Sequence, residues 1–142
     1  MTGSSFDIAV VGGGIAGLMA AHHAALAGAS VAHFIEGGLP GGLVMNVGAL
    51  DGWPAVGRVG GAELAAGLLE ENDELGATLV PSRIDLIQDR AVKTLNGPDG
   101  VWRARQVIVA TGAALRTLDV PGVDRLTGRG VSQCAWCDGG LY

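Results

Sequence analysis

The chain has 142 residues, enough for one domain with a single hydrophobic core. Nine lysines and arginines against fourteen aspartates and glutamates give a formal net charge of −5, which argues against nucleic acid and anionic membrane as partners. The 25 glycines lie between apolar runs and form no repeat, so the composition indicates a compact, turn-rich α/β chain.

The amino-terminal segment carries no targeting signature. Residues 1–7 contain no lysine or arginine, and the apolar stretch after them is not followed by a small-residue cleavage site. We therefore expect no secretory signal and a cytoplasmic location. Glycines and histidines interrupt the apolar stretch over residues 8–29, which favours a strand, a turn and a helix over a membrane span.

The first 36 residues predict a strand–helix–strand unit. Residues 6–11 are an apolar run rich in β-branched side chains, typical of a buried parallel strand. Residues 15–26 predict a helix that ends at Gly28, and residues 30–35 predict the next strand. Residues 37–61 are irregular and rich in Gly and Pro, and a long irregular segment in a compact domain is usually functional.

A dinucleotide-binding fingerprint stands between the first strand and its helix, at Gly12-Gly13-Gly14-Ile15-Ala16-Gly17. Gly12 would allow the tight turn, Gly14 would let a pyrophosphate approach the helix N-terminus, and Gly17 would let helix and strand pack closely. Glu36 lies about 20 positions further on, where an acid can hold ribose hydroxyls. Because an acid there disfavours a 2′-phosphate, the fingerprint predicts FAD or NAD rather than NADP.

The remaining elements complete an α/β fold. Residues 62–75 predict a helix with a solvated acidic face, Glu70 to Glu74, and residues 77–80 predict a short strand. Residues 84–87, 91–95 and 101–105 predict an antiparallel meander, and residues 107–110 predict a strand that returns to the main sheet. The expected fold is a Rossmann-like parallel sheet with a three-stranded antiparallel meander, ending in a CxxC segment.

Both cysteines lie near the end of the chain, at Cys134 and Cys137 beside Asp138, after a Gly- and Pro-containing connector. Two thiols at this spacing can close a disulfide or lower each other's pKa, and so pass two electrons. A CxxC can also form half of a zinc site, which needs two further ligands. The other candidates, His22, His23 and His33, all lie in the first nucleotide-binding unit, so we favour redox chemistry and predict no metal site.

Several conspicuous side chains have ordinary structural interpretations. His22 and His23 are adjacent on the predicted helix and cannot face one site together, so we expect surface or packing roles for both. We expect Trp53 and Trp102 in the core or in hairpins rather than as stacking platforms.

These residues resemble the low-molecular-weight thioredoxin reductases and their flavoprotein relatives over residues 7–142. The resemblance rests on the fingerprint with Glu36, on Gly41-Gly42, Trp53-Pro54 and Ala110-Thr111-Gly112-Ala113, and above all on Gly128-Arg129-Gly130-Val131-Ser132 leading into Cys134-Ala135-Trp136-Cys137-Asp138-Gly139. It implies that residues 1–115 are the amino-terminal part of an FAD-binding domain. Residues 116–142 would be a connector and the CxxC start of an NADPH domain that is otherwise absent.

The resemblance also implies site roles. Cys137 would face the flavin ring and receive its electrons, Cys134 would attack the substrate disulfide, and Asp138 would move protons during thiol exchange. NADPH would supply electrons from a site outside this chain, and the substrate would be a thioredoxin-like protein or a low-molecular-weight disulfide. A full-length protein would be a homodimer. FAD would be held by Gly12, Gly14, Ile15, Ala16, Gly17, Glu36, Gly42, Ala110, Thr111 and Gly112.

Two departures from the family pattern concern polar side chains near the flavin in relatives. This chain has Leu43 after Gly41-Gly42 where the family has Gln, and Asp51-Gly52 where the family has Glu-Asn. They predict altered flavin electronics or a different substrate. No second GxGxxG follows, so we expect the chain to be inactive alone. It would then be the product of a truncated reading frame, a fragment, or one half of a split enzyme. Two alternatives stay open: a non-catalytic nucleotide-binding fragment or subunit, and an FAD-dependent dithiol oxidase.

Overall fold

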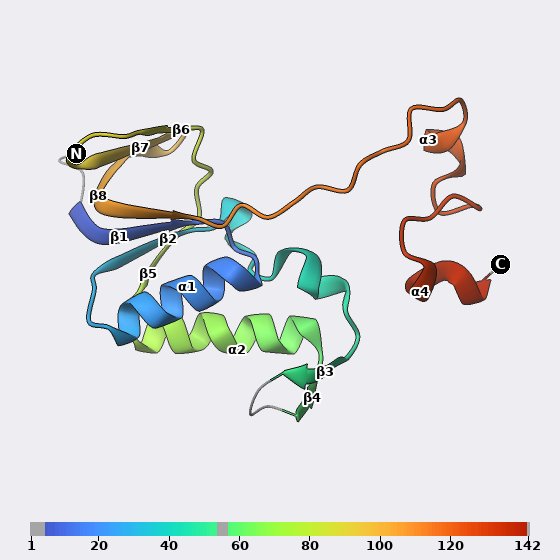
Figure 1. Ribbon diagram of the computed structural model, residues 1–142, viewed down its shortest axis with the longest axis horizontal. Helices are drawn as coiled ribbons and strands as arrows, with labels where there is room; N and C mark the ends of the chain where they lie inside the picture. Colours follow the sequence, from blue (N-terminus) through green and yellow to red (C-terminus); the bar gives the residue numbers. More distant parts are fainter. Residues whose placement is uncertain (1–4, 54–56, 142) are drawn as a thin grey trace. The chain divides into compact units, whose positions relative to one another are not determined.

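The structure is a computed structural model that describes residues 5–53 and 57–141. Its main sheet has the strand order β5-β2-β1-β8-β7-β6 (Figure 1). Strands β5, β2, β1 and β8 run parallel, whereas β8, β7 and β6 form an antiparallel meander. The predicted fold class is therefore confirmed. The strands are β1 (Ser5–Val11), β2 (Val31–Phe34), β5 (Thr78–Val80), β6 (Leu86–Gln88), β7 (Lys93–Gly97) and β8 (Gly100–Val109).

The central strand β1 is buried on both faces, as its apolar sequence predicts. Val10 packs with Ala21 of the first helix on one face, and Ala9 packs with Phe34 and Leu95 on the other. Successive side chains of a strand point to opposite faces, so a continuous apolar run is required where both faces are covered.

Two helices cover one face of the sheet. Helix α1 (Ile15–Leu26) packs on β1 and β2, and α2 (Gly61–Glu74) packs beside α1 (Figure 1). Leu18 of α1 is fully buried between them, and burial of one leucine contributes about 2–3 kcal/mol at most. Leu75, which we predicted within the second helix, follows its end and is 37 % exposed.

The prediction of two separate strands at residues 101–105 and 107–110 is wrong, because β8 is one continuous strand. Residues 100–104 pair with β7 and residues 103–109 pair with β1, so that Arg103 and Ala104 have partners on both sides. The polar residues Arg105 and Gln106 do not interrupt the strand because both side chains are exposed. A polar pair on an exposed sheet position needs no break in the backbone.

The segment expected to be irregular, residues 37–61, contains a short hairpin. Strands β3 (Leu50–Trp53) and β4 (Gly57–Val59) pair antiparallel, after two 3₁₀ turns, η1 (Glu36–Gly38) and η2 (Gly42–Asn46). Strands of three and four residues that contain glycine and aspartate have little β propensity, which explains why periodicity did not reveal them. The side chain of Trp53 and residue Pro54 lie outside the described part of the chain, as does Tyr142.

The chain divides into two compact units, Met1–Gly112 and Ala113–Tyr142. The second unit contains α3 (Val123–Leu126), α4 (Ala135–Asp138) and η3 (Gly139–Leu141). A turn after α3 returns the chain on itself, because the N–H groups of Arg129 and Val131 both donate to the Leu126 carbonyl. Within residues 5–53 and 57–141, no helix is long and apolar enough to cross a bilayer.

Candidate functional site

The fingerprint turn lies at the carboxyl end of β1, where parallel strands of an α/β sheet bind ligands. Gly12 has φ +119°, and a Cβ atom there would lie 2.2 Å from the Ala110 carbonyl oxygen. Its N–H donates to the Phe34 carbonyl at 2.9 Å. Only glycine combines this backbone angle with such a close approach to the neighbouring strand.

Gly14 begins helix α1 and has the free space that an anion would need. It is the N-cap of α1, offers no side-chain cap, and a Cβ atom on it would meet nothing within 4 Å. The first backbone N–H groups of a helix lack intrahelical acceptors, and a phosphate can accept from them. Ile15 and Ala16, both predicted cofactor residues, form the first turn, and Ala16 is exposed.

Gly17 brings the helix against the turn. A Cβ atom at Gly17 would lie 1.8 Å from the Gly12 carbonyl oxygen. That oxygen also accepts a hydrogen bond from Nε2 of His33, at 2.9 Å. The predicted close packing at Gly17 is therefore present, and a side chain from β2 supports it.

His33 is a residue that sequence reasoning considered only as a zinc ligand. It is 1 % exposed, and burial lowers its pKa from 6.5, although the bond to the Gly12 carbonyl acts in the opposite direction. A neutral ring that donates from Nε2 holds the fingerprint turn on β2. One histidine in an otherwise apolar strand was the signal that could have identified it.

The second glycine pair lies against the fingerprint. The N–H of Gly41 donates to the Gly13 carbonyl at 2.6 Å, and Gly41 forms an isolated parallel bridge with Gly14. Gly42 has φ +56°, and a Cβ atom there would be 3.3 Å from the Gly14 Cα. The structure thus brings Gly42 next to Gly14, although the two residues are far apart in the sequence.

Glu36 follows β2 after Ile35, and its carboxylate is exposed. An arginine not singled out by the sequence, Arg83, approaches it, with Nη1 3.9 Å from Oε1. Arg83 is held more closely by Asp85, whose Oδ1 accepts a hydrogen bond from Arg83 Nε at 2.6 Å, and this bond raises the arginine pKa. Because Glu36 is only loosely paired, its oxygens stay open to hydroxyl donors.

Three predicted cofactor residues follow β8. The Ala110 N–H donates to the Val11 carbonyl at 2.8 Å, and the Thr111 nitrogen lies 3.0 Å from where a Gly12 Cβ would be. Gly112 is exposed, with φ +73°. Ala110 and Thr111 therefore lie beside the fingerprint turn, and Gly112 continues from them.

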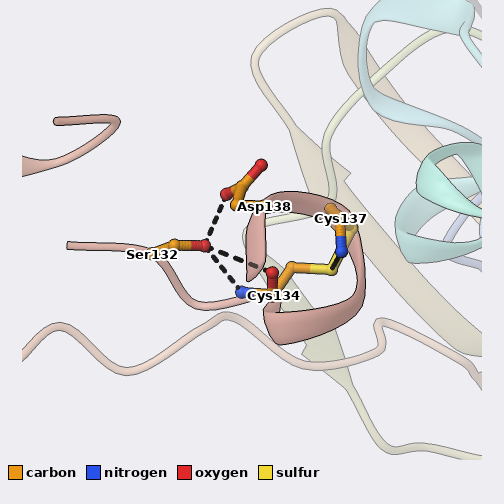
Figure 2. Close-up of a disulfide and its surroundings, with 4 residues drawn as sticks. All are labelled: Ser132, Cys134, Cys137 and Asp138. Carbon is orange, nitrogen blue, oxygen red and sulfur yellow. Dashed lines mark hydrogen bonds between the residues drawn. A yellow bond between two sulfur atoms is a disulfide. The ribbon is translucent and has the colours of Figure 1, made fainter. Parts of the chain in front are cut away.

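The second group of predicted residues lies in the other unit. Cys134 and Cys137 form a disulfide, with their Cα atoms 5.3 Å apart (Figure 2). The Cys137 N–H points at the Cys134 sulfur, 3.1 Å away, and Cys137 is exposed whereas Cys134 is half-buried. Among the described residues, no three histidine, cysteine, aspartate or glutamate side chains gather as a metal site.

Asp138 ends α4, next to Cys137, and its side chain meets a serine (Figure 2). The Ser132 hydroxyl lies 2.5 Å from Asp138 Oδ2 and accepts the Cys134 N–H at 3.0 Å. The sequence motif contained Ser132, but nothing in the spacing alone indicated that its hydroxyl would reach the acid.

His22, His23 and Trp102 have the surface or packing positions expected of them. His22 Nδ1 lies 3.6 Å from Glu71, and His23 is exposed. Trp102 packs edge-on against Phe34, with ring centroids 5.1 Å apart. The acidic residues of α2 are exposed as predicted, but Asn72 among them is 2 % exposed and donates to the Leu18 carbonyl of α1 at 3.0 Å.

Comparisons with known proteins agree over nearly the whole chain. The family model described as "Pyridine nucleotide-disulphide oxidoreductase" matches residues 6–141. The thioredoxin reductase of Peptoclostridium acidaminophilum is 37 % identical over 139 residues, covering 96 % of this chain and 44 % of the relative. That of Bacillus subtilis (strain 168) is 34 % identical over 138 residues, covering 96 % and 43 %.

A solved structure, that of Lactococcus lactis thioredoxin reductase, superposes with a TM-score of 0.82 at 31 % identity, covering 96 % of this chain and 45 % of the other. The chain therefore spans less than half the length of the relatives that it matches.

Proposed function

Because this chain belongs to the pyridine nucleotide-disulphide oxidoreductase family, we propose that it supplies the FAD cradle and the redox disulfide of a thioredoxin reductase-like enzyme. Electrons would pass from NADPH through FAD to Cys134 and Cys137, and on to a disulfide of a thioredoxin-like protein or a small molecule. The observation that carries this proposal is the Cys134–Cys137 disulfide in a chain that also contains the glycine cradle, which is the fingerprint turn Gly12 to Gly17 together with Gly41 and Gly42.

The cradle fits the adenosine and pyrophosphate part of FAD. Gly14 leaves open space before the first N–H groups of α1, which would bind the pyrophosphate. Glu36 would accept from ribose hydroxyls, and Gly42 and Thr111 would border the cofactor on either side of the fingerprint. When bound, FAD supplies the two-electron exchange with the disulfide.

The cysteine pair would carry out thiol–disulfide exchange. The Cys134 thiolate attacks one sulfur of the substrate, a mixed disulfide forms, and the other substrate sulfur leaves and takes a proton from Asp138. The Cys137 thiolate then attacks the Cys134 sulfur, which restores the Cys134–Cys137 disulfide and releases the second substrate sulfur as a thiolate. The Cys137 N–H near the Cys134 sulfur supports Cys134 as the attacking thiolate, because it can donate to the negative sulfur.

The test combines the chain with a polypeptide that supplies the NADPH-binding portion of the relatives. We expect a yellow protein whose flavin absorbance bleaches with NADPH and which reduces an added disulfide. Cys137→Ser should abolish disulfide reduction. Bleaching followed by undiminished disulfide reduction in this variant would overturn the assigned roles.

Two further results would favour the alternatives. A colourless chain that binds only NAD or adenosine monophosphate weakly would favour a non-catalytic nucleotide-binding module. Oxygen-dependent oxidation of an added dithiol, with no need for NADPH, would favour an oxidase.

A further inference from the structure

The Ser132 hydroxyl lies among three polar groups of the cysteine segment (Figure 2). It accepts the Cys134 N–H at 3.0 Å, faces Asp138 Oδ2 at 2.5 Å, and lies 3.4 Å from the Cys134 carbonyl oxygen. Asp138 and the Cys134 carbonyl are both acceptors when the acid is ionised, but a hydroxyl has one hydrogen to donate. The carboxylate receives it, because an ionised acceptor forms the stronger bond.

We propose that Ser132 is a positioning residue that holds Asp138 beside the cysteine pair in both protonation states, by turning its hydroxyl hydrogen between Asp138 and the Cys134 carbonyl. The proposal rests on the proposed function, in which Asp138 gives a proton to the leaving thiolate. It assigns Ser132 no contact with substrate or cofactor.

Both states satisfy the hydrogen-bonding capacity of the groups. With Asp138 ionised, Ser132 donates to Oδ2 and accepts the Cys134 N–H. With Asp138 protonated, the acid donates to the Ser132 oxygen, which still accepts the Cys134 N–H on its other lone pair and donates to the Cys134 carbonyl. That carbonyl also accepts the Asp138 N–H at 3.0 Å and has a second lone pair for the serine.

The acid depends on this serine for its orientation. Among the side chains that the structure describes, which leave out Trp53 and Trp136, only that of Ser132 hydrogen-bonds to the Asp138 carboxylate, and no lysine, arginine or histidine forms an ion pair with it. Asp138 is half-buried at the end of a four-residue helix. Without the serine, the carboxyl group is free to rotate away from the leaving sulfur.

The reduced Cys134 sulfur attacks the substrate disulfide, one sulfur–sulfur bond forms and one breaks, and the departing thiolate takes the proton of Asp138. Asp138 becomes ionised, and the Ser132 hydrogen turns from the Cys134 carbonyl to the new carboxylate. A leaving group that is stable as a thiolate needs no proton, so its departure should not depend on either residue.

This difference gives a test that needs neither flavin nor NADPH. The whole chain is reduced, freed of reductant, and mixed in stopped flow with one of two disulfides. Bis(hydroxyethyl) disulfide releases a basic thiolate, and dithiobis(nitrobenzoic acid) releases a stable one. Ser132→Ala should slow the first reaction about tenfold, a part of the roughly 10²–10⁴-fold that a positioned acid contributes, and leave the second within about twofold of wild type.

Two control variants separate positioning from a structural effect. Ser132→Thr keeps the hydroxyl and should restore the rate. Thr127→Val removes a hydroxyl of the same unit that donates to the Val123 carbonyl at 2.8 Å and does not reach Asp138, so both rates should stay at the wild-type value. In the double variant Ser132→Ala/Asp138→Asn, the rate should equal that of Asp138→Asn alone, because both changes act through one group.

The outcomes distinguish a failure of the positioning role of Ser132 from a failure of the acid role of Asp138. If Asp138→Asn slows the first reaction and Ser132→Ala does not, positioning by Ser132 is wrong while the acid role stands. Equal slowing of both disulfides by Ser132→Ala also overturns it, since the serine would then act on the cysteine pair itself. No effect of Asp138→Asn removes the acid role and this inference with it.

Discussion

Two glycines of the fingerprint, Gly17 and Gly14, should respond differently to the same added methyl group. In Gly17→Ala, the new Cβ would start 1.8 Å from the Gly12 carbonyl oxygen, whereas real contacts at Cβ stay at or above 3.0 Å, so the turn must open by more than an ångström. Overpacking of this kind costs about 1–3 kcal/mol, and loss of the His33 bond to Gly12 costs about 1 kcal/mol more. Higher helix propensity of alanine returns about 1 kcal/mol. We therefore expect the free energy of unfolding to fall by about 1–3 kcal/mol.

Gly14→Ala should leave the fold intact and weaken cofactor binding. Gly14 has φ −72° and ψ 175°, which alanine adopts, and its Cβ would meet no protein atom within 4 Å. The poorer N-cap costs up to about 1 kcal/mol, and the smaller entropy of the unfolded chain returns a similar amount. The methyl group would, however, occupy the approach of the pyrophosphate to α1. A steric penalty of about 1–3 kcal/mol there corresponds to roughly 5- to 150-fold weaker FAD binding.

Urea denaturation followed by far-ultraviolet circular dichroism measures the first effect, and equilibrium dialysis against FAD measures the second. Gly17→Ala within about 0.5 kcal/mol of wild type would refute the packing argument. Unchanged FAD affinity in Gly14→Ala would refute the placement of the pyrophosphate, and a large loss of stability in that variant would show that the space around Gly14 is not free.

Three further predictions concern hydrogen bonds of Asn72, His33 and Asp7. Asn72→Ala should lower the free energy of unfolding in urea by about 1–2 kcal/mol, because the buried amide donates to the Leu18 carbonyl, and wild-type stability would contradict this. The pKa of His33 is lowered in the folded protein, so the unfolded chain binds a proton at higher pH than the folded chain does. The free energy of unfolding should therefore fall as pH drops below about 6.5. Thermal unfolding measured across pH should show a shallower fall for His33→Gln. The pKa of Asp7 is lowered from 3.8, chiefly by the Ser30 hydroxyl hydrogen bond; its contribution is present above pH 3.8 and lost as pH falls through the folded pKa, and an Asp7→Asn variant with the same acid limb as wild type would sink this account.

Much of the first unit, Met1–Gly112, could be predicted because the sequence signals for its elements are local. The β1 run, the turn at Gly12 and the start of α1 lie within about a dozen consecutive residues, and apolar period and glycine placement determine them through nearest neighbours. Errors arose where pairing decided the outcome. Strand β8 continues through Arg105 and Gln106 because its pairing with β1 begins before its pairing with β7 ends, and no local pattern encodes those partners.

The sequence by itself determined the fold class, the cradle at Gly12 to Gly17, and a cysteine pair close enough in the chain to bond. Only the tertiary structure showed the hydrogen bonds that Gly41, His33 and Asn72 donate. Their acceptors are the backbone carbonyls of Gly13, Gly12 and Leu18, respectively. The physical reason is the range of the interactions. Backbone angles and side-chain period act over a few residues and can be read in order, whereas a buried polar atom is satisfied by whichever group the packed chain brings within hydrogen-bonding distance.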